Sequence, residues 1–166
     1  DYVGVWSAKR EVLALAYERF ARELPLRSPR AQAFASFRRA RGEGLELFAR
    51  FEALDTRFRS ASPPRHGWRQ WPAPYHDARG PAVLAFADEH ADEIGFHAFL
   101  QWLADEQLTA AARTARGQGM AVGLYLDLAV AADAGGADAW RDRSILALDL
   151  TVGAPPDELQ LNGQNW

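Results

Sequence analysis

Residues 117–130 decide the fold class of this chain, and their sequence is Gly117-Gln118-Gly119-Met120-Ala121-Val122-Gly123-Leu124-Tyr125-Leu126-Asp127-Leu128-Ala129-Val130. A helical pattern ends just before this stretch, and Gly117 is predicted to adopt the left-handed conformation that often closes a helix. Small or apolar residues then occupy both alternating sets of positions from 120 to 126, which predicts a strand buried on both faces. A helix, a glycine turn and a buried strand make half of an α/β unit.

Asp127 stands where this predicted strand ends. In α/β barrels the C-terminal ends of the strands form the active-site face, so Asp127 is a candidate functional residue. A carboxylate at such a position also commonly caps the following loop. From the strand and the turn alone, both roles remain open.

Length and composition narrow the class of protein. The 166 residues suffice for one domain with a real core, but a complete (β/α)8 barrel needs about 250 residues. There is no cysteine, which excludes disulfides and thiolate chemistry. The sequence shows no long apolar run and no signal peptide, so we expect a cytoplasmic protein without a membrane partner. Because the chain starts at Asp1 and stops at Trp166, it is expected to be a piece of a longer protein.

The charge is distributed unevenly. Residues 1–80 carry 15 basic and 9 acidic side chains, a net charge of +6, whereas residues 81–166 carry 4 and 13, a net charge of −9. Such a split is also seen in nucleic-acid-binding arms. The arginines are spread over helical patterns, however, which favours solvated helix faces and ion pairs with the acidic half.

Most of the first 116 residues follow a helical period. Apolar side chains recur every three or four positions over residues 8–23, and Pro25 is predicted to end this helix. Ser28-Pro29 is an N-cap followed by a proline at the first helical position. Further helices are predicted from there to Gly42, then over 45–59, 81–90 and 92–116. These helices together predict a small helical subdomain.

The remaining segments are loops by composition. Residues 60–80 are rich in proline, and their indoles, Trp68 and Trp71, are expected to plug the base of the loop rather than to stack on sugars. One helical turn is predicted around Trp140, and Trp102 and Trp140 are expected in the core. Residues 145–152 are an ambiguous apolar run with a possible β-like conformation. The four histidines lack the spacing of a zinc site, and no phosphate-binding loop is present, so no metal or cofactor is expected.

Several ordered motifs resemble one family, the 4-alpha-glucanotransferases, also called amylomaltases or disproportionating enzymes. The resemblance is specific from about Phe99 onward and looser upstream. The motifs that carry it are Phe99-Leu100-Gln101-Trp102-Leu103-Ala104-Asp105, residues 119–130 as quoted above, Gly136-Ala137-Asp138-Ala139-Trp140, Val152-Gly153-Ala154-Pro155-Pro156-Asp157 and Gly163-Gln164-Asn165-Trp166. Two departures affect the expected loop path: Ala131 replaces a usual glycine, and Leu126 replaces an often charged residue.

The resemblance implies a mainly α fold, with a helical subdomain plus one or two short β-strands excised from a (β/α)8 barrel enzyme. Residues 1–116 would be the inserted helical subdomain. Residues 117–166 would hold the third barrel strand and a loop that covers the active site. The partners implied are α-1,4-glucans and maltooligosaccharides, with neither nucleic acid nor membrane.

The resemblance also implies which residues contact glucan and where the catalytic carboxylates lie. The substrate-binding candidates are Asp127, Pro155, Pro156, Asp157 and Trp166. For Asp157, simple loop capping competes with ligand contact. Retaining transfer uses two catalytic carboxylates about 5 Å apart. The resemblance places these carboxylates beyond Trp166, so no catalytic residue is expected in this chain and the chain alone is expected to be inactive.

One alternative comes from another class of protein. A stand-alone helical module could use the basic first half to bind a protein or nucleic acid. That interpretation predicts salt-sensitive binding of residues 1–80 to polyanions.

Overall fold

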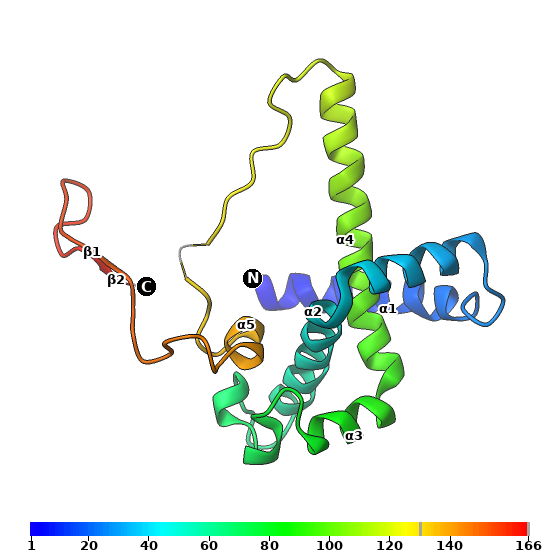
Figure 1. Cartoon of the computed structure of the whole chain (residues 1–166), viewed down its shortest axis with the longest axis horizontal. Coiled ribbons are helices and arrows are strands. Elements are labelled where there is room, and N and C mark those ends of the chain that lie inside the picture. The colour runs from blue at the N-terminus through cyan, green and yellow to red at the C-terminus, as the bar shows by residue number, and fades with distance from the viewer. Residues whose placement is uncertain (130, 166) are drawn as a thin grey trace.

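The computed structural model describes residues 1–129 and 131–165 and shows a mainly α fold, as predicted. Figure 1 shows a body of packed helices from which α4 projects, with a long extended stretch returning from its far end. None of the helices in the described part is both long and apolar enough to cross a membrane. The elements in chain order are α1 (Tyr2–Ala21), α2 (Pro29–Arg59), the 3-10 turns η1 (Trp68–Gln70) and η2 (Ala73–Tyr75), α3 (Pro81–Glu89), α4 (Ala91–Gly117), α5 (Ala137–Arg141), β1 (Gly153–Ala154) and β2 (Gln164–Asn165).

Helix α2 begins where the sequence predicts. The Ser28 hydroxyl oxygen accepts a hydrogen bond from the Ala31 amide at 3.1 Å, and Pro29 occupies the first turn. The helix kinks at Gly42, which has φ 60° and ψ −149°. The two predicted helices are therefore two halves of one bent element, because glycine adopts this conformation without the steric cost that a Cβ brings.

One aromatic cluster joins α1, the first half of α2, and α4. Phe20 stacks on Phe99 with ring centroids 4.9 Å apart and meets Phe34 edge to face at 5.4 Å. Trp102, predicted as a core residue, is buried beside these rings. Aromatic contacts of this kind contribute about 0.5–1.5 kcal/mol each beyond the area that they bury. The cluster holds α1 against the first half of α4.

Helices α1 and α4 approach closely at Gly95. A Cβ built on Gly95 would clash with the Tyr17 hydroxyl and lie 3.3 Å from the ring carbon that carries it. Tyr17 itself is held by Phe96 and Phe99, so its ring has little room to move.

Gly95→Ala is therefore expected to lower the free energy of unfolding by about 1–3 kcal/mol, because it overpacks this contact. Urea unfolding measures the change. The double variant Gly95→Ala/Tyr17→Phe removes the clashing oxygen and should recover much of the loss. A loss of equal size in the double variant would show that the clash is not the cause.

A second aromatic cluster plugs the proline-rich loop onto the second half of α2. Trp71 lies 5.2 Å from Phe51 and 5.3 Å from Phe58, centroid to centroid. Trp68 is also buried. The prediction that the indoles of residues 60–80 serve packing is confirmed. Helix α5 adds Trp140, whose ring centroid lies 5.9 Å from that of Trp71.

The predicted pairing between the basic and acidic halves is present on α4. Arg10 reaches Glu93 at 3.8 Å, Arg30 reaches Glu106 at 3.7 Å, and Arg41 pairs with Asp105. The side chains are partly exposed, so each pair contributes little stability.

Three local predictions are wrong. Residues 120–126 form no strand; the backbone bends at 121–122, Gly123 has φ 75°, and the large apolar side chains are exposed rather than buried on both faces. A strand needs neighbouring strands, and in the described part of the chain β1 and β2 pair only with each other. Gly119, with φ 83°, takes the left-handed position in place of Gly117. Residues 145–152 form turns and irregular backbone instead of a β-like segment.

Candidate functional site

Asp127 lies in an extended arm, which we define as residues 120–129. The arm is highly exposed: Tyr125 shows 92% and Leu128 89% of its surface to solvent. Asp127 is exposed as well. Exposed apolar residues on both sides of a carboxylate, in extended backbone, indicate a surface that another structure covers. The geometry leaves the Asp127 carboxylate accessible to a polar ligand.

The other predicted contacts belong to a hairpin, residues 153–165. Gly153 pairs with Asn165 and Ala154 with Gln164 in antiparallel register. Pro155 and Pro156 are exposed in the loop between them. The Asp157 carboxylate accepts hydrogen bonds from the amides of Leu159 at 2.8 Å and Gln160 at 2.7 Å. Asp157 therefore orders this loop, and its contact with glucan stays a prediction.

Gly163 closes the hairpin with φ 71°. A Cβ at this position would lie 2.6 Å from the carbonyl oxygen of Ala154. Both the backbone conformation and the space require glycine here.

Gly163→Ala is expected to open the hairpin while leaving the helices intact. The amide resonances of residues 153–165 should collapse towards random-coil shifts in an NMR spectrum, and the thermal midpoint should stay within about 2 °C, because the two-residue strands carry little of the core. Gly44→Ala is the matched control, since a Cβ there meets no atom within 4 Å. Unchanged hairpin resonances in Gly163→Ala would contradict the role given to this glycine.

The structure does not bring all predicted residues together. Asp127 and residues 155–157 sit on separate extended segments that lie before and after α5 in the chain (Figure 1). The prediction for Trp166 lies outside the described residues. The catalytic carboxylates are expected beyond Trp166, outside this chain, and their position stays a prediction.

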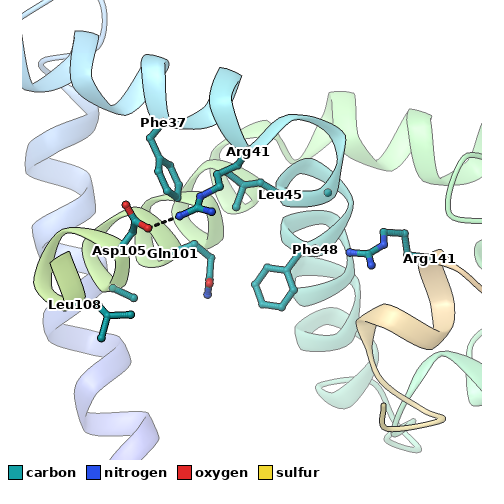
Figure 2. A pocket seen from close by; sticks show the side chains of 10 residues that line it. Phe37, Arg41, Leu45, Phe48, Gln101, Asp105, Leu108 and Arg141 are labelled. Atoms are coloured by element: carbon teal, nitrogen blue, oxygen red, sulfur yellow. Dashed lines mark hydrogen bonds and ion pairs between the residues drawn. The ribbon is translucent and has the colours of Figure 1, made fainter. Parts of the chain in front are cut away.

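A groove that the sequence did not reveal lies at the kink of α2 (Figure 2). Its volume is about 500 Å³. The Arg41–Asp105 ion pair spans it from α2 to α4, and Phe37 and Phe48 supply apolar surface. The groove exists because the two halves of α2 diverge at Gly42, and a helical pattern alone does not give the angle of a kink.

A larger cleft of about 910 Å³ lies between the second half of α2, His97 of α4 and the turn before α5. Glu52 lines it, and burial, then the nearby Asp55 charge, raises the pKa of Glu52. Burial, then the Arg10 charge, lowers the pKa of His97 to about 4. The carboxylates and imidazoles of the cleft suit hydrogen bonding to a small polar molecule. Among the residues described, no group of three or more histidine and carboxylate side chains is placed to hold a metal ion.

These observations define a class of architecture: a helical body that holds two extended, exposed segments rich in apolar side chains. The chain belongs to the 4-alpha-glucanotransferase family, because the family description matches it over residues 1–166.

Similar proteins named 4-alpha-glucanotransferase occur in several bacteria. The chain is 39% identical over its whole length to one from Mycobacterium bovis, of which it covers 21%. It is 33% identical to one from Haemophilus influenzae, again over its whole length and covering 24% of that protein. With one from Thermus thermophilus it shares 29% identity over 99% of its length, covering 32% of the relative. The chain thus spans about a fifth to a third of these relatives.

Proposed function

We propose that this chain forms the helical subdomain and part of the glucan-binding wall of an enzyme that transfers α-1,4-glucan segments between maltooligosaccharides. The observation that carries the proposal is the family match over the whole chain combined with its partial coverage of the relatives. The exposed apolar arm and hairpin fit this role, since both present surface that other parts of an enzyme would cover.

The division of labour follows the expected boundary. In the proposed enzyme, residues 1–116 form the inserted helical subdomain. Residues 117–166 contribute the covering loop and the third barrel strand, which residues 120–126 would form once neighbouring strands outside this chain pair with them. Helix α5 lies within the second part but packs on the body through Trp140. We infer that it ties the two parts together.

The chemistry proposed is transfer with retained configuration. A carboxylate nucleophile forms a covalent glycosyl-enzyme, and a second carboxylic acid protonates the leaving sugar and then activates the acceptor. Excluding water from this intermediate favours transfer to a sugar, which is a suitable task for a covering loop. These carboxylates belong to the enzyme outside this chain, so this chain supplies binding surface.

A disproportionation assay with maltotriose tests the proposal. The enzyme that contains this chain should convert maltotriose to glucose and longer maltooligosaccharides, and the 166-residue chain alone should not. Turnover by the chain alone would overturn the assignment of the catalytic carboxylates. Failure of the complete enzyme to redistribute glucose units would overturn the proposed function.

Asp127→Asn tests the substrate contact. In the complete enzyme this variant is expected to lower the transfer rate about tenfold or more, since hydrogen bonds to a charged acceptor contribute about 1.5–3 kcal/mol. The thermal midpoint should change little, because the role proposed for Asp127 is contact with the substrate rather than packing. A loss of stability with unchanged transfer would assign Asp127 a structural role.

A further inference from the structure

Helix α1 carries two apolar stripes, and only one of them packs in the described part of the chain. The packed stripe holds Leu13, Tyr17 and Phe20, whose partners are α4 and the first half of α2. The second stripe, which we call the outer stripe, consists of Val5, Ala8, Val12, Leu15 and Ala16. At 3.6 residues per turn the two stripes are centred about 115° apart around the helix axis, so they are separate faces.

The outer stripe is continuous and faces solvent. Steps of three, four and three residues lead from Val5 through Ala8 and Val12 to Leu15. Side chains three or four positions apart are neighbours on an α-helix, so the stripe runs along one side of α1 for about three turns. Val5 is 54%, Val12 68% and Leu15 66% exposed.

The other long helices do not expose apolar side chains in this way. In the described chain, the 31 residues of α2 include no exposed large apolar side chain, and the 27 residues of α4 include one, Leu108. The described side chains of α1 include four, of which Trp6 lines the larger cleft and the other three belong to the outer stripe. A surface helix normally has one apolar stripe and a polar opposite side. Helix α1 is therefore patterned as a helix that is covered on two sides.

The size of the outer stripe indicates which kind of partner covers it. Stable interfaces between separate proteins involve about 20–30 residues on each side, and the stripe has five. Free molecules also lose translational and rotational freedom when they associate. Two surfaces of one covalent chain meet at a high effective concentration, so a small apolar patch suffices between them. A contact within one enzyme therefore fits the stripe better than a second copy of the chain.

Most of an enzyme of this family lies outside these 166 residues. The chain covers 21% of the Mycobacterium bovis relative and 32% of the Thermus thermophilus relative. Figure 1 shows the first turns of α1 projecting past the other helices, so a further layer of structure can reach this part of the helix from the side.

We propose that the outer stripe of α1 is the surface by which the helical subdomain docks onto the part of the enzyme outside this chain. The covering surface is apolar, and Val12 and Leu15 lie in the middle of the contact. The packed stripe then holds α1 to its own subdomain, while the outer stripe holds the subdomain to the rest of the enzyme. The proposal rests on membership of the family and on the partial coverage of the relatives, and it does not depend on the glucan chemistry.

Site-specific thiol labelling compares the chain alone with the complete enzyme. Val12→Cys and Leu15→Cys are each treated with a maleimide, and mass spectrometry of the digested protein follows modification at that one position. Cysteines elsewhere in the enzyme therefore do not interfere. Both thiols should react rapidly in the 166-residue chain, where the native side chains are exposed. In the complete enzyme both should react at least about twentyfold more slowly, because a covered thiol is inaccessible.

Ser7→Cys is the matched control. Ser7 is also exposed on α1, but it lies about 130° around the axis from the outer stripe. Its thiol should react at similar rates in both proteins. Equal rates in chain and enzyme for Val12→Cys and Leu15→Cys, or an equally strong slowing of Ser7→Cys, would overturn the proposal. Slower labelling of the chain alone when it is concentrated a hundredfold would assign the stripe to a second copy, which overturns it as well.

The double variant Val12→Glu/Leu15→Lys tests whether the contact stabilises the enzyme. It keeps the net charge and places an acid three positions before a base, a favourable pair on an exposed helix. The thermal midpoint of the chain alone should stay within about 2 °C. In the complete enzyme it should fall by about 5 °C or more, because apolar surface would enclose both charges.

A complete enzyme that no longer folds with this double variant, while the chain alone still does, is the same result in stronger form. An unchanged midpoint in the complete enzyme would contradict the docking. Neither the labelling nor the midpoint requires turnover, so failure of the maltotriose assay and failure of this proposal are separate results.

Discussion

Trp140→Ala is expected to destabilise the chain by about 3–5 kcal/mol, a larger loss than that expected for Gly95→Ala. The indole is 1% exposed and packs against Phe51 and Trp71, with ring centroids 5.8 and 5.9 Å away. Its removal leaves a cavity between α2 and α5, and the Tyr75 carbonyl loses its donor. Urea unfolding followed by circular dichroism measures the loss.

Two control variants separate the causes. Trp140→Phe keeps most of the volume and should cost about 1–3 kcal/mol, chiefly through the lost hydrogen bond. Trp6→Ala removes a half-exposed indole from α1 and should cost much less. A Trp140→Ala loss no greater than that of Trp6→Ala would show that α5 does not belong to the folded body.

Acidification is expected to destabilise the chain through His97. The side chain is 4% exposed, and burial followed by the Arg10 charge lowers its pKa from 6.5 to about 4. Between these two values the unfolded chain binds a proton that the folded chain does not. The His97 contribution to the free energy of unfolding is therefore fully present above pH 6.5. It falls as the pH drops towards 4 and stays constant below that. The contribution lost by pH 4.5 is about 2 kcal/mol.

The buried Nε2 atom of His97 has no hydrogen-bond partner among the described residues, so a charge there would stay uncompensated. Urea unfolding at several pH values gives the slope. His97→Gln should flatten the curve between pH 6.5 and 4 by about the amount stated. A His97→Gln curve that runs parallel to that of the parent would show that another group causes the acid sensitivity.

The sequence predicts the later helices well because their signals are local, whereas α1 begins six residues before the predicted residue 8 and ends at Ala21, before Pro25. Ser28-Pro29 marks the start of α2 by its own chemistry, and the predicted end of a helix at Gly42 falls where α2 bends. The structure confirms Trp102 and Trp140 as core residues. The family resemblance is confirmed as well, because the family matches the chain over residues 1–166.

The failures have a common physical origin. The apolar alternation of residues 120–126 predicts a buried strand only where neighbouring strands supply hydrogen bonds, and the described part of this chain contains none for them. The composition of residues 153–165 predicts a loop and does not reveal the hairpin. Its strands are only two residues long, and its turn depends on Asp157 and Gly163. The sequence does not reveal the hydrogen bond from Trp68 to Ala134, because the two residues are 66 positions apart in the chain.

The central claim is that the helical body holds an unpaired arm that becomes part of a larger enzyme. Hydrogen exchange followed by mass spectrometry tests it most directly, on the 166-residue chain and on the complete enzyme. In the chain alone, amides 121–129 should exchange within seconds, while those of α2 and α4 near the aromatic clusters stay protected. In the complete enzyme the same arm amides should become protected at least a hundredfold. Equal protection of the arm in both proteins would contradict the account.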